Sequence, residues 1–195
     1  CLIPFRVALA AQADKWWVRS VIIWSKPNPM PESVRDRPTE SHEYILMLTK
    51  SARYYWDMEA VGEPNTIGTL ERAQYKPGTK EYSKRLIDKT TDIWLSDIRP
   101  GGRNLRSVWS LPTAQFAGVH FATFPKELVK RCVLAATPEA TVPAVVLDPF
   151  SGSGTVGMVA KSLGRKAILI DLSPEYAALA HKRVEAVSLP FVPAK

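Results

Sequence analysis

Short apolar runs alternate along this chain with stretches whose apolar residues recur at helical spacing. The apolar runs predict strands, at residues 17–24, 44–48, 144–147 and 166–170. The helical spacing predicts helices, at residues 4–13, 125–136, 155–163 and 174–187. Strands and helices that alternate in this way predict an α/β fold with a mostly parallel sheet.

The last of these helices has the clearest local signals. Ser173 is placed to act as its N-cap, and Pro174 stands at the first helical position, where proline is favoured. Its apolar stripe is expected to face the core and consists of Tyr176, Leu179, Ala180, Val184 and Val187.

Two stretches lack any such periodicity. Residues 27–38 contain four prolines and are therefore expected to form a loop. Residues 57–100 are polar and charged, and prolines and glycines interrupt them repeatedly. A stretch of this length within a compact domain is usually either functional or disordered, so we interpret it as an insertion.

A glycine-rich loop joins the third predicted strand to the helix that follows. Asp148 ends the strand, Gly152 and Gly154 lie in the loop, and Asp171 ends the next strand. Glycines allow a tight turn and a close approach of the backbone to a ligand. Strand, glycine loop, helix, strand and acid are the layout of a nucleotide-type cofactor site, in which the acid accepts hydrogen bonds from ribose hydroxyls.

The glycine spacing alone does not decide which cofactor is bound. Gly152, Gly154 and Gly157 match the dinucleotide pattern G-x-G-x-x-G, which keeps an NAD-dependent oxidoreductase open as an alternative. A turn without any ligand is a further alternative. A phosphate-binding P-loop is excluded, because no Gly-Lys-Ser/Thr follows the glycines.

The residues around the glycines carry a more specific resemblance. The segment Asp148-Pro149-Phe150-Ser151-Gly152-Ser153-Gly154-Thr155 resembles the S-adenosylmethionine loop of DNA amino-methyltransferases. The segments at residues 23–34, 36–39, 41–46, 103–109 and 120–125 resemble the same family. The chain is therefore similar to the permuted, beta-type DNA methyltransferases of exocyclic amines, in which the catalytic half precedes the cofactor half.

The resemblance implies a Rossmann-like methyltransferase sheet in permuted order, with an inserted recognition region. It implies the end of the catalytic half at residues 1–56, target recognition at 57–117 and the cofactor half at 118–195. S-adenosylmethionine is the implied cofactor. Its implied contacts are Asp148, Pro149, Phe150, Ser151, Gly152, Ser153, Gly154, Thr155 and Asp171, with Thr123 and Phe124 beside the methionine part.

Charge and resemblance together point to double-stranded DNA as the partner. The formal net charge is +7 at pH 7, which favours a polyanion, although a merely basic protein would show the same. Lys26 and Asn28 follow a strand end, where α/β sheets place ligands. The candidate phosphate contacts are Lys76, Lys80, Lys84, Arg85, Arg103 and Arg106, unless the insertion is simply a solvated loop.

One departure from the family concerns catalysis. The family's tetrapeptide, an Asp, Asn or Ser followed by two prolines and an aromatic residue, does not occur in residues 1–195. We therefore expect a chain truncated at its N-terminus, with the catalytic motif upstream of residue 1. The expected function is site-specific methylation of N4 of cytosine or N6 of adenine, as in restriction–modification. The alternative is a fragment that binds cofactor or DNA without catalysis.

The histidines, the cysteines and the lengths of the apolar runs indicate the cellular compartment. Three histidines and two cysteines are scattered along the chain, which predicts neither a metal site nor a disulfide framework. A reducing, cytoplasmic setting is then the default, and the resemblance implies a bacterial or phage gene. No apolar run approaches the ~18 residues of a membrane-spanning helix.

Overall fold

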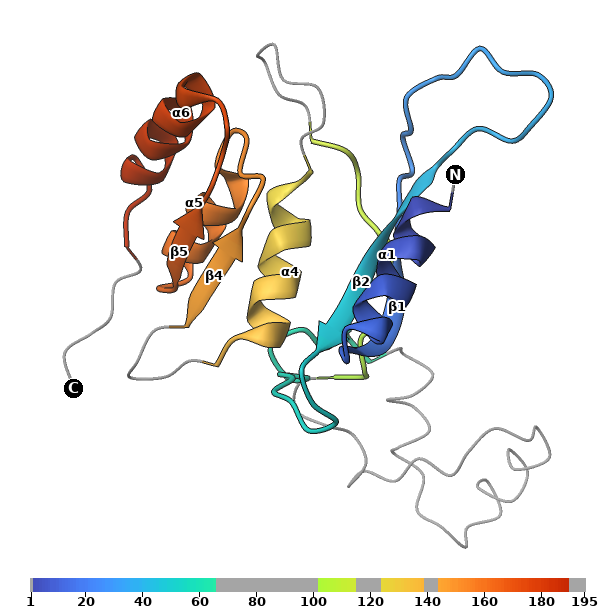
Figure 1. The fold of residues 1–195 in the computed structure, drawn as a ribbon, viewed down its shortest axis with the longest axis horizontal. Coiled ribbons are helices and arrows are strands. Elements are labelled where there is room, and N and C mark those ends of the chain that lie inside the picture. The colour runs from blue at the N-terminus through green and yellow to red at the C-terminus, as the bar shows by residue number, and fades with distance from the viewer. Residues whose placement is uncertain (1, 66–101, 115–123, 139–143, 190–195) are drawn as a thin grey trace, which may run out of the picture. The chain divides into compact units, whose positions relative to one another are not determined.

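The computed structural model describes residues 2–65, 102–114, 124–138 and 144–189 (Figure 1). Its helices are α1 (Ile3–Ala13), α4 (Lys126–Ala136), α5 (Thr155–Ser162) and α6 (Pro174–Glu185). Its strands are β1 (Trp17–Ser25), β2 (His42–Thr49), β3 (Val108–Ser110), β4 (Val145–Asp148) and β5 (Lys166–Leu169). The four predicted helices and four predicted strands are confirmed, with ends that differ by a residue or two.

The contacts divide the chain into two units. One unit comprises residues 1–56 and 106–195, and the other comprises residues 57–105. Within the second unit, Glu63 and Arg103 form an antiparallel bridge, with backbone N–H to O distances of 2.9 and 2.8 Å. Their side chains also form an ion pair, with 2.9 Å between Nη2 and Oε2, so this bridge joins the two described ends of that unit.

The three-stranded sheet has the order β2-β1-β3. β1 and β2 are antiparallel, with β2 at the edge, whereas β1 and β3 are parallel. Trp24 and Trp109 stand opposite each other in the ladder and are 3% and 2% exposed. The buried indole N–H of Trp24 donates to the Leu111 carbonyl at 2.8 Å, so a long-range bond fixes the register of β3. Figure 1 shows α1 against β1 and β2.

The second sheet pairs β4 and β5 in parallel, from Val145 opposite Lys166 to Asp148 opposite Leu169. Two parallel strands require a crossover connection, and α5 provides it. α4 packs on α5 through the buried residues Val129, Val133 and Val159. Val146 and Val156, which stand on either side of the strand-to-helix loop, pack against this cluster.

One face of the β4–β5 sheet carries exposed aliphatic side chains. Val145, Leu147, Ile168 and Ile170 are each between 51% and 60% exposed. Parallel sheets are normally covered on both faces, because their strands are apolar on both sides. This face is therefore a hydrophobic surface in the chain as described.

The apolar stripe expected along α6 is buried at one position. Ala180 is 3% exposed and packs against the loop, whereas Tyr176 is 37% exposed. The prediction of Tyr176 as a core residue is therefore wrong. α6 packs on α5.

Candidate functional site

The loop between β4 and α5 has a backbone that glycine alone adopts readily. Gly152 has φ 47° and Gly154 has φ 76°, both in the left-handed region. A side chain on Gly154 would also meet α6, because its Cβ would lie 2.7 Å from the Ala180 Cβ. Both the conformation and the close packing therefore require glycine at residue 154.

Backbone hydrogen bonds hold this loop in a fixed shape. The Ser151 N–H donates to the Ile170 carbonyl at 2.9 Å, and the Gly154 N–H donates to the Ser151 carbonyl at 2.8 Å. The Phe150 N–H donates to Oδ1 of Asp148 at 3.1 Å. Ser151 and Ser153 are buried at 8% exposure. These bonds fix the loop from within the chain, which lowers the entropy that binding must overcome.

Asp171 lies beside this loop with both carboxylate oxygens in use. Oδ2 accepts from the Gly152 N–H at 2.7 Å, and Oδ1 accepts from the Ser173 N–H at 2.9 Å. A carboxylate has about four acceptor positions, so Asp171 can still accept hydrogen bonds from a ligand. The sequence did not reveal its bond to Gly152, because that contact spans 19 residues and depends on the pairing of β4 with β5.

Ser173 is confirmed as the N-cap of α6. Its hydroxyl accepts from the Tyr176 N–H at 3.3 Å and donates to Oε2 of Glu175 at 2.6 Å. The second bond stabilises the ionised carboxylate and lowers the pKa of Glu175. Because Ser173 performs the capping, Asp171 remains available to the loop.

The other expected cofactor contacts differ in their exposure to solvent. Phe150 is 89% exposed and Pro149 is exposed, so both are accessible from solvent. Phe124 packs against the core valines of α4 and α5. Its role beside the methionine part remains a prediction, and Thr123 lies outside the described residues.

The candidate DNA contacts lie in several places, and the described ones have protein partners. Lys26 forms an ion pair with Glu43, and the side chain of Asn28 accepts from the Thr113 N–H at 3.1 Å. Arg103 pairs with Glu63, and the backbone carbonyl of Arg106 accepts from the Trp109 indole. The remaining candidates lie outside the described residues and are Lys76, Lys80, Lys84 and Arg85.

Two kinds of feature are absent from the described residues. No three His, Cys, Asp or Glu side chains within them are grouped as metal ligands. Within the same residues, no helix is both long and apolar enough to cross a membrane.

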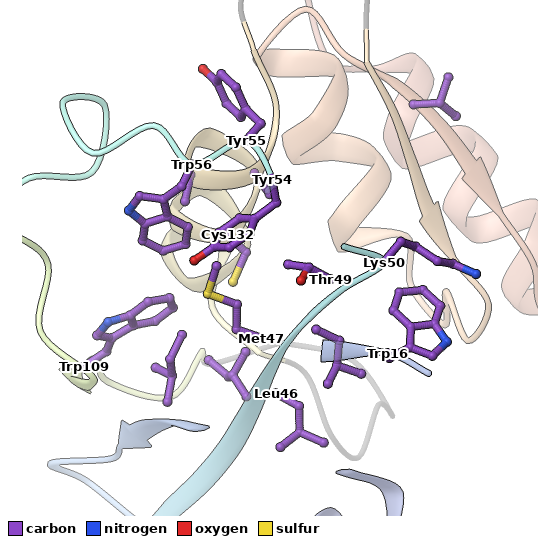
Figure 2. A pocket seen from close by; sticks show the side chains of 16 residues that line it. Trp16, Leu46, Met47, Thr49, Lys50, Tyr54, Tyr55, Trp56, Trp109 and Cys132 are labelled. Atoms are coloured by element: carbon purple, nitrogen blue, oxygen red, sulfur yellow. The ribbon is translucent and has the colours of Figure 1, made fainter. Parts of the chain in front are cut away.

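A hollow of about 810 Å³ is lined by residues of β2, of the segment that follows it and of α4, among others (Figure 2). Its wall includes Trp16, Trp56, Trp109 and Cys132, and no residue from 148 to 155 lines it. Burial raises the pKa of the Cys132 thiol to about 11, although the nearby Arg131 opposes the shift. The thiol is therefore protonated at neutral pH. Among the described residues, none of the candidate cofactor contacts lines this hollow.

Comparison with known proteins identifies the family. Residues 3–182 match the N6/N4 DNA methylase family, which is most of the chain. The chain belongs to this family. It is 45% identical over 183 residues to the type II methyltransferase M.Cfr9I of Citrobacter freundii, covering 94% of this chain and 49% of that protein. The chain therefore spans about half the length of the curated relatives it matches.

Solved methylase structures share the fold. A putative DNA modification methylase of Thermus thermophilus, complexed with S-adenosyl-L-methionine, is 28% identical with a TM-score of 0.51, covering 90% of this chain and 56% of that one. The PvuII DNA methyltransferase, specific for N4 of cytosine, is 20% identical with a TM-score of 0.60, covering 94% and 57%. The mixed α/β fold of a DNA methylase is thus shown for this chain.

Proposed function

We propose that this DNA methylase chain binds S-adenosylmethionine and belongs to an enzyme that methylates an exocyclic amine in double-stranded DNA. The observation that carries the proposal is the loop from Asp148 to Thr155, closed against Asp171 by the hydrogen bond from Gly152. The Citrobacter freundii relative, a type II methyltransferase, and the Thermus structure with S-adenosylmethionine bound support it.

The proposed reaction needs positioning more than it needs acid–base groups. The amine nitrogen attacks the sulfonium methyl carbon, the N–C bond forms as the S–C bond breaks, and the nitrogen then loses a proton. Holding two reactants in line can supply roughly 7–11 kcal/mol of the barrier. Within this chain, Asp148 would hold the methionine amine and Asp171 the ribose hydroxyls, which fixes the methyl donor.

The target base is proposed only as a class. An amine inside a duplex is hidden by base pairing, so the enzyme must turn the nucleotide out of the stack to reach it. Either N4 of cytosine or N6 of adenine fits the family. Lys26 and Asn28 follow the carboxyl end of β1, and we assign them to the DNA side of the site.

The finer architecture belongs to the same proposal. We infer a permuted order, with residues 1–56 ending the catalytic half and residues 118–195 forming the cofactor half. Residues 57–117 would form the target-recognition region. The setting would be the bacterial cytoplasm, as for a restriction–modification enzyme.

Calorimetric titration distinguishes this proposal from an oxidoreductase. We expect the chain to bind S-adenosylmethionine and its demethylated product, S-adenosylhomocysteine, and to give no heat of binding with NAD. Both ligand classes fit a glycine loop with a strand-end acid, so the titration compares them directly. Binding of NAD in preference to S-adenosylmethionine would contradict the proposal.

A triple replacement tests the DNA side. Changing Lys80, Lys84 and Arg85 to alanine should weaken DNA binding, because each contact with a phosphate releases counterions. If all three contact phosphates, the slope of log K against log salt concentration should shrink by about 2–3 units. The measurement is fluorescence anisotropy of labelled DNA at several salt concentrations. An unchanged slope would remove this region from the DNA interface.

The matched control also removes three positive charges, but from the half of the chain assigned to the cofactor. Lys130, Lys166 and Lys182 are exposed and lie on α4, β5 and α6, in the half assigned to the cofactor. Their triple replacement by alanine should leave the slope closer to that of the unaltered chain. If both triple variants lose the same slope, net charge alone explains the effect.

A further inference from the structure

α6 contacts the glycine loop at two positions one helical turn apart. Ala180 packs on Gly154, where an added Cβ would lie 2.9 Å from the Ala180 Cα. Three residues later, Nη1 of Arg183 donates a hydrogen bond to the Ser153 carbonyl. Residues three apart share one face of a helix, so a single face of α6 both packs on the loop and bonds to it.

Arg183 helps to hold the peptide between Ser153 and Gly154 in one orientation. The peptide between Ser153 and Gly154 has its carbonyl bonded to Arg183, and its N–H donates to the Ser151 carbonyl at 2.8 Å. Two peptides earlier in the chain, the peptide between Ser151 and Gly152 is also held. Its N–H, which belongs to Gly152, donates to Oδ2 of Asp171 at 2.7 Å. Both peptides that flank the Gly152–Ser153 peptide are therefore held from outside the loop.

The Gly152–Ser153 peptide, which lies between them, presents the Ser153 N–H. Among the described residues, nothing accepts a hydrogen bond from this N–H. α5 begins two residues later, at Thr155. A backbone N–H beside a helix N-terminus is suited to an anionic group, and the methionine carboxylate of the proposed cofactor is such a group.

We propose that Arg183 is a positioning residue for the cofactor loop. It holds the Ser153–Gly154 peptide so that the Ser153 N–H points at the carboxylate of S-adenosylmethionine. This inference rests on the proposed cofactor and adds a residue from α6 to the site. Arg183 acts through the backbone of the loop and does not touch the ligand itself.

The docking of α6 does not depend on Arg183 alone. Nζ of Lys161, on α5, donates to the carbonyls of Val184 at 2.9 Å and Glu185 at 3.2 Å. Ala180 is also 3% exposed in its contact with the loop. Replacing Arg183 should therefore alter the loop and leave α6 in place, so a binding defect can be separated from unfolding.

The experiment compares two ligands on three variants. Arg183→Met keeps the apolar part of the side chain and removes the donor, Arg183→Lys keeps a charged donor, and Lys182→Met is the matched control on the exposed side of α6. The ligands are S-adenosylmethionine and 5′-methylthioadenosine, which lacks the amino-acid carboxylate. Affinities are measured by calorimetry and folding by circular dichroism.

The expected result is selective for the carboxylate. Arg183→Met should weaken S-adenosylmethionine about tenfold and change 5′-methylthioadenosine by less than about threefold. Arg183→Lys should recover most of the loss, and Lys182→Met should bind like the unaltered chain. A folded Arg183→Met chain with unchanged affinity, or with an equal loss for both ligands, would overturn the inference. If the unaltered chain binds neither ligand, it is the proposed function that fails.

Discussion

Replacing Asp171 with alanine is expected to weaken S-adenosylmethionine binding about ten- to a hundredfold. A hydrogen bond to a charged group contributes roughly 1.5–3 kcal/mol, which corresponds to that range of affinity. The structure adds a second reason, because the same carboxylate holds the Gly152 N–H at 2.7 Å. The variant therefore loses a ligand contact and a support of the loop together. Calorimetry on the folded variant measures the change.

The ligand pair used for Arg183 separates these two contributions. 5′-Methylthioadenosine retains the ribose, so Asp171→Ala should weaken it as well as S-adenosylmethionine. Arg183→Met should weaken the binding of S-adenosylmethionine much more than that of 5′-methylthioadenosine. Glu175→Ala is the charge-matched control, because Glu175 is an exposed acid in the first turn of α6. Unchanged affinity in a folded Asp171→Ala chain would remove Asp171 from the cofactor site.

The sequence predicts the cofactor loop well because its determinants are local. Gly152 and Gly154 are required by positive φ angles, and Ser173 and Pro174 begin a helix by capping rules that involve neighbouring residues. The order of strand, loop, helix and strand follows from apolar periodicity. Each of these signals lies within a few residues of the feature that it specifies.

The features that the sequence did not predict depend on contacts between distant residues. β3 has three residues, too few for a periodic pattern, and it is fixed by pairing with β1 and by the Trp24 indole. Arg183 reaches Ser153 across 30 residues, and its sequence position indicates only an ordinary charge near a helix end. The predicted burial of Ala180 is confirmed, but the sequence does not indicate that Ala180 packs against Gly154. These contacts join residues that are far apart in the chain, so no local pattern in the sequence indicates them.

Residues 1–195 alone are expected to bind S-adenosylmethionine but to leave DNA unmethylated. The loop from Asp148 to Thr155 and Asp171 are assembled, so the methyl donor has its contacts. The Asp, Asn or Ser followed by Pro-Pro and an aromatic residue, expected to hold the target amine, does not occur in this sequence. Without it the amine is not aligned, and much of the roughly 7–11 kcal/mol available from orientation is lost.

Transfer of a labelled methyl group to DNA of mixed sequence measures this expectation. The comparison is a longer polypeptide that carries such a tetrapeptide ahead of Cys1, which should methylate the same DNA. Steady turnover by residues 1–195 alone would place the catalytic groups within them and contradict our assignment. Transfer by neither polypeptide, with the cofactor bound by both, would favour a binding role without catalysis.

The exposed face of β4 and β5 predicts a second difference between residues 1–195 and the longer polypeptide, in their tendency to aggregate. Val145, Leu147, Ile168 and Ile170 present aliphatic side chains to solvent, and β4 has an unpaired edge among the described residues. Open edges and apolar faces of this kind promote aggregation. If added sequence covers this face as well as supplying the tetrapeptide, the longer polypeptide should stay monomeric at concentrations where residues 1–195 aggregate. Light scattering of both polypeptides measures this difference in aggregation.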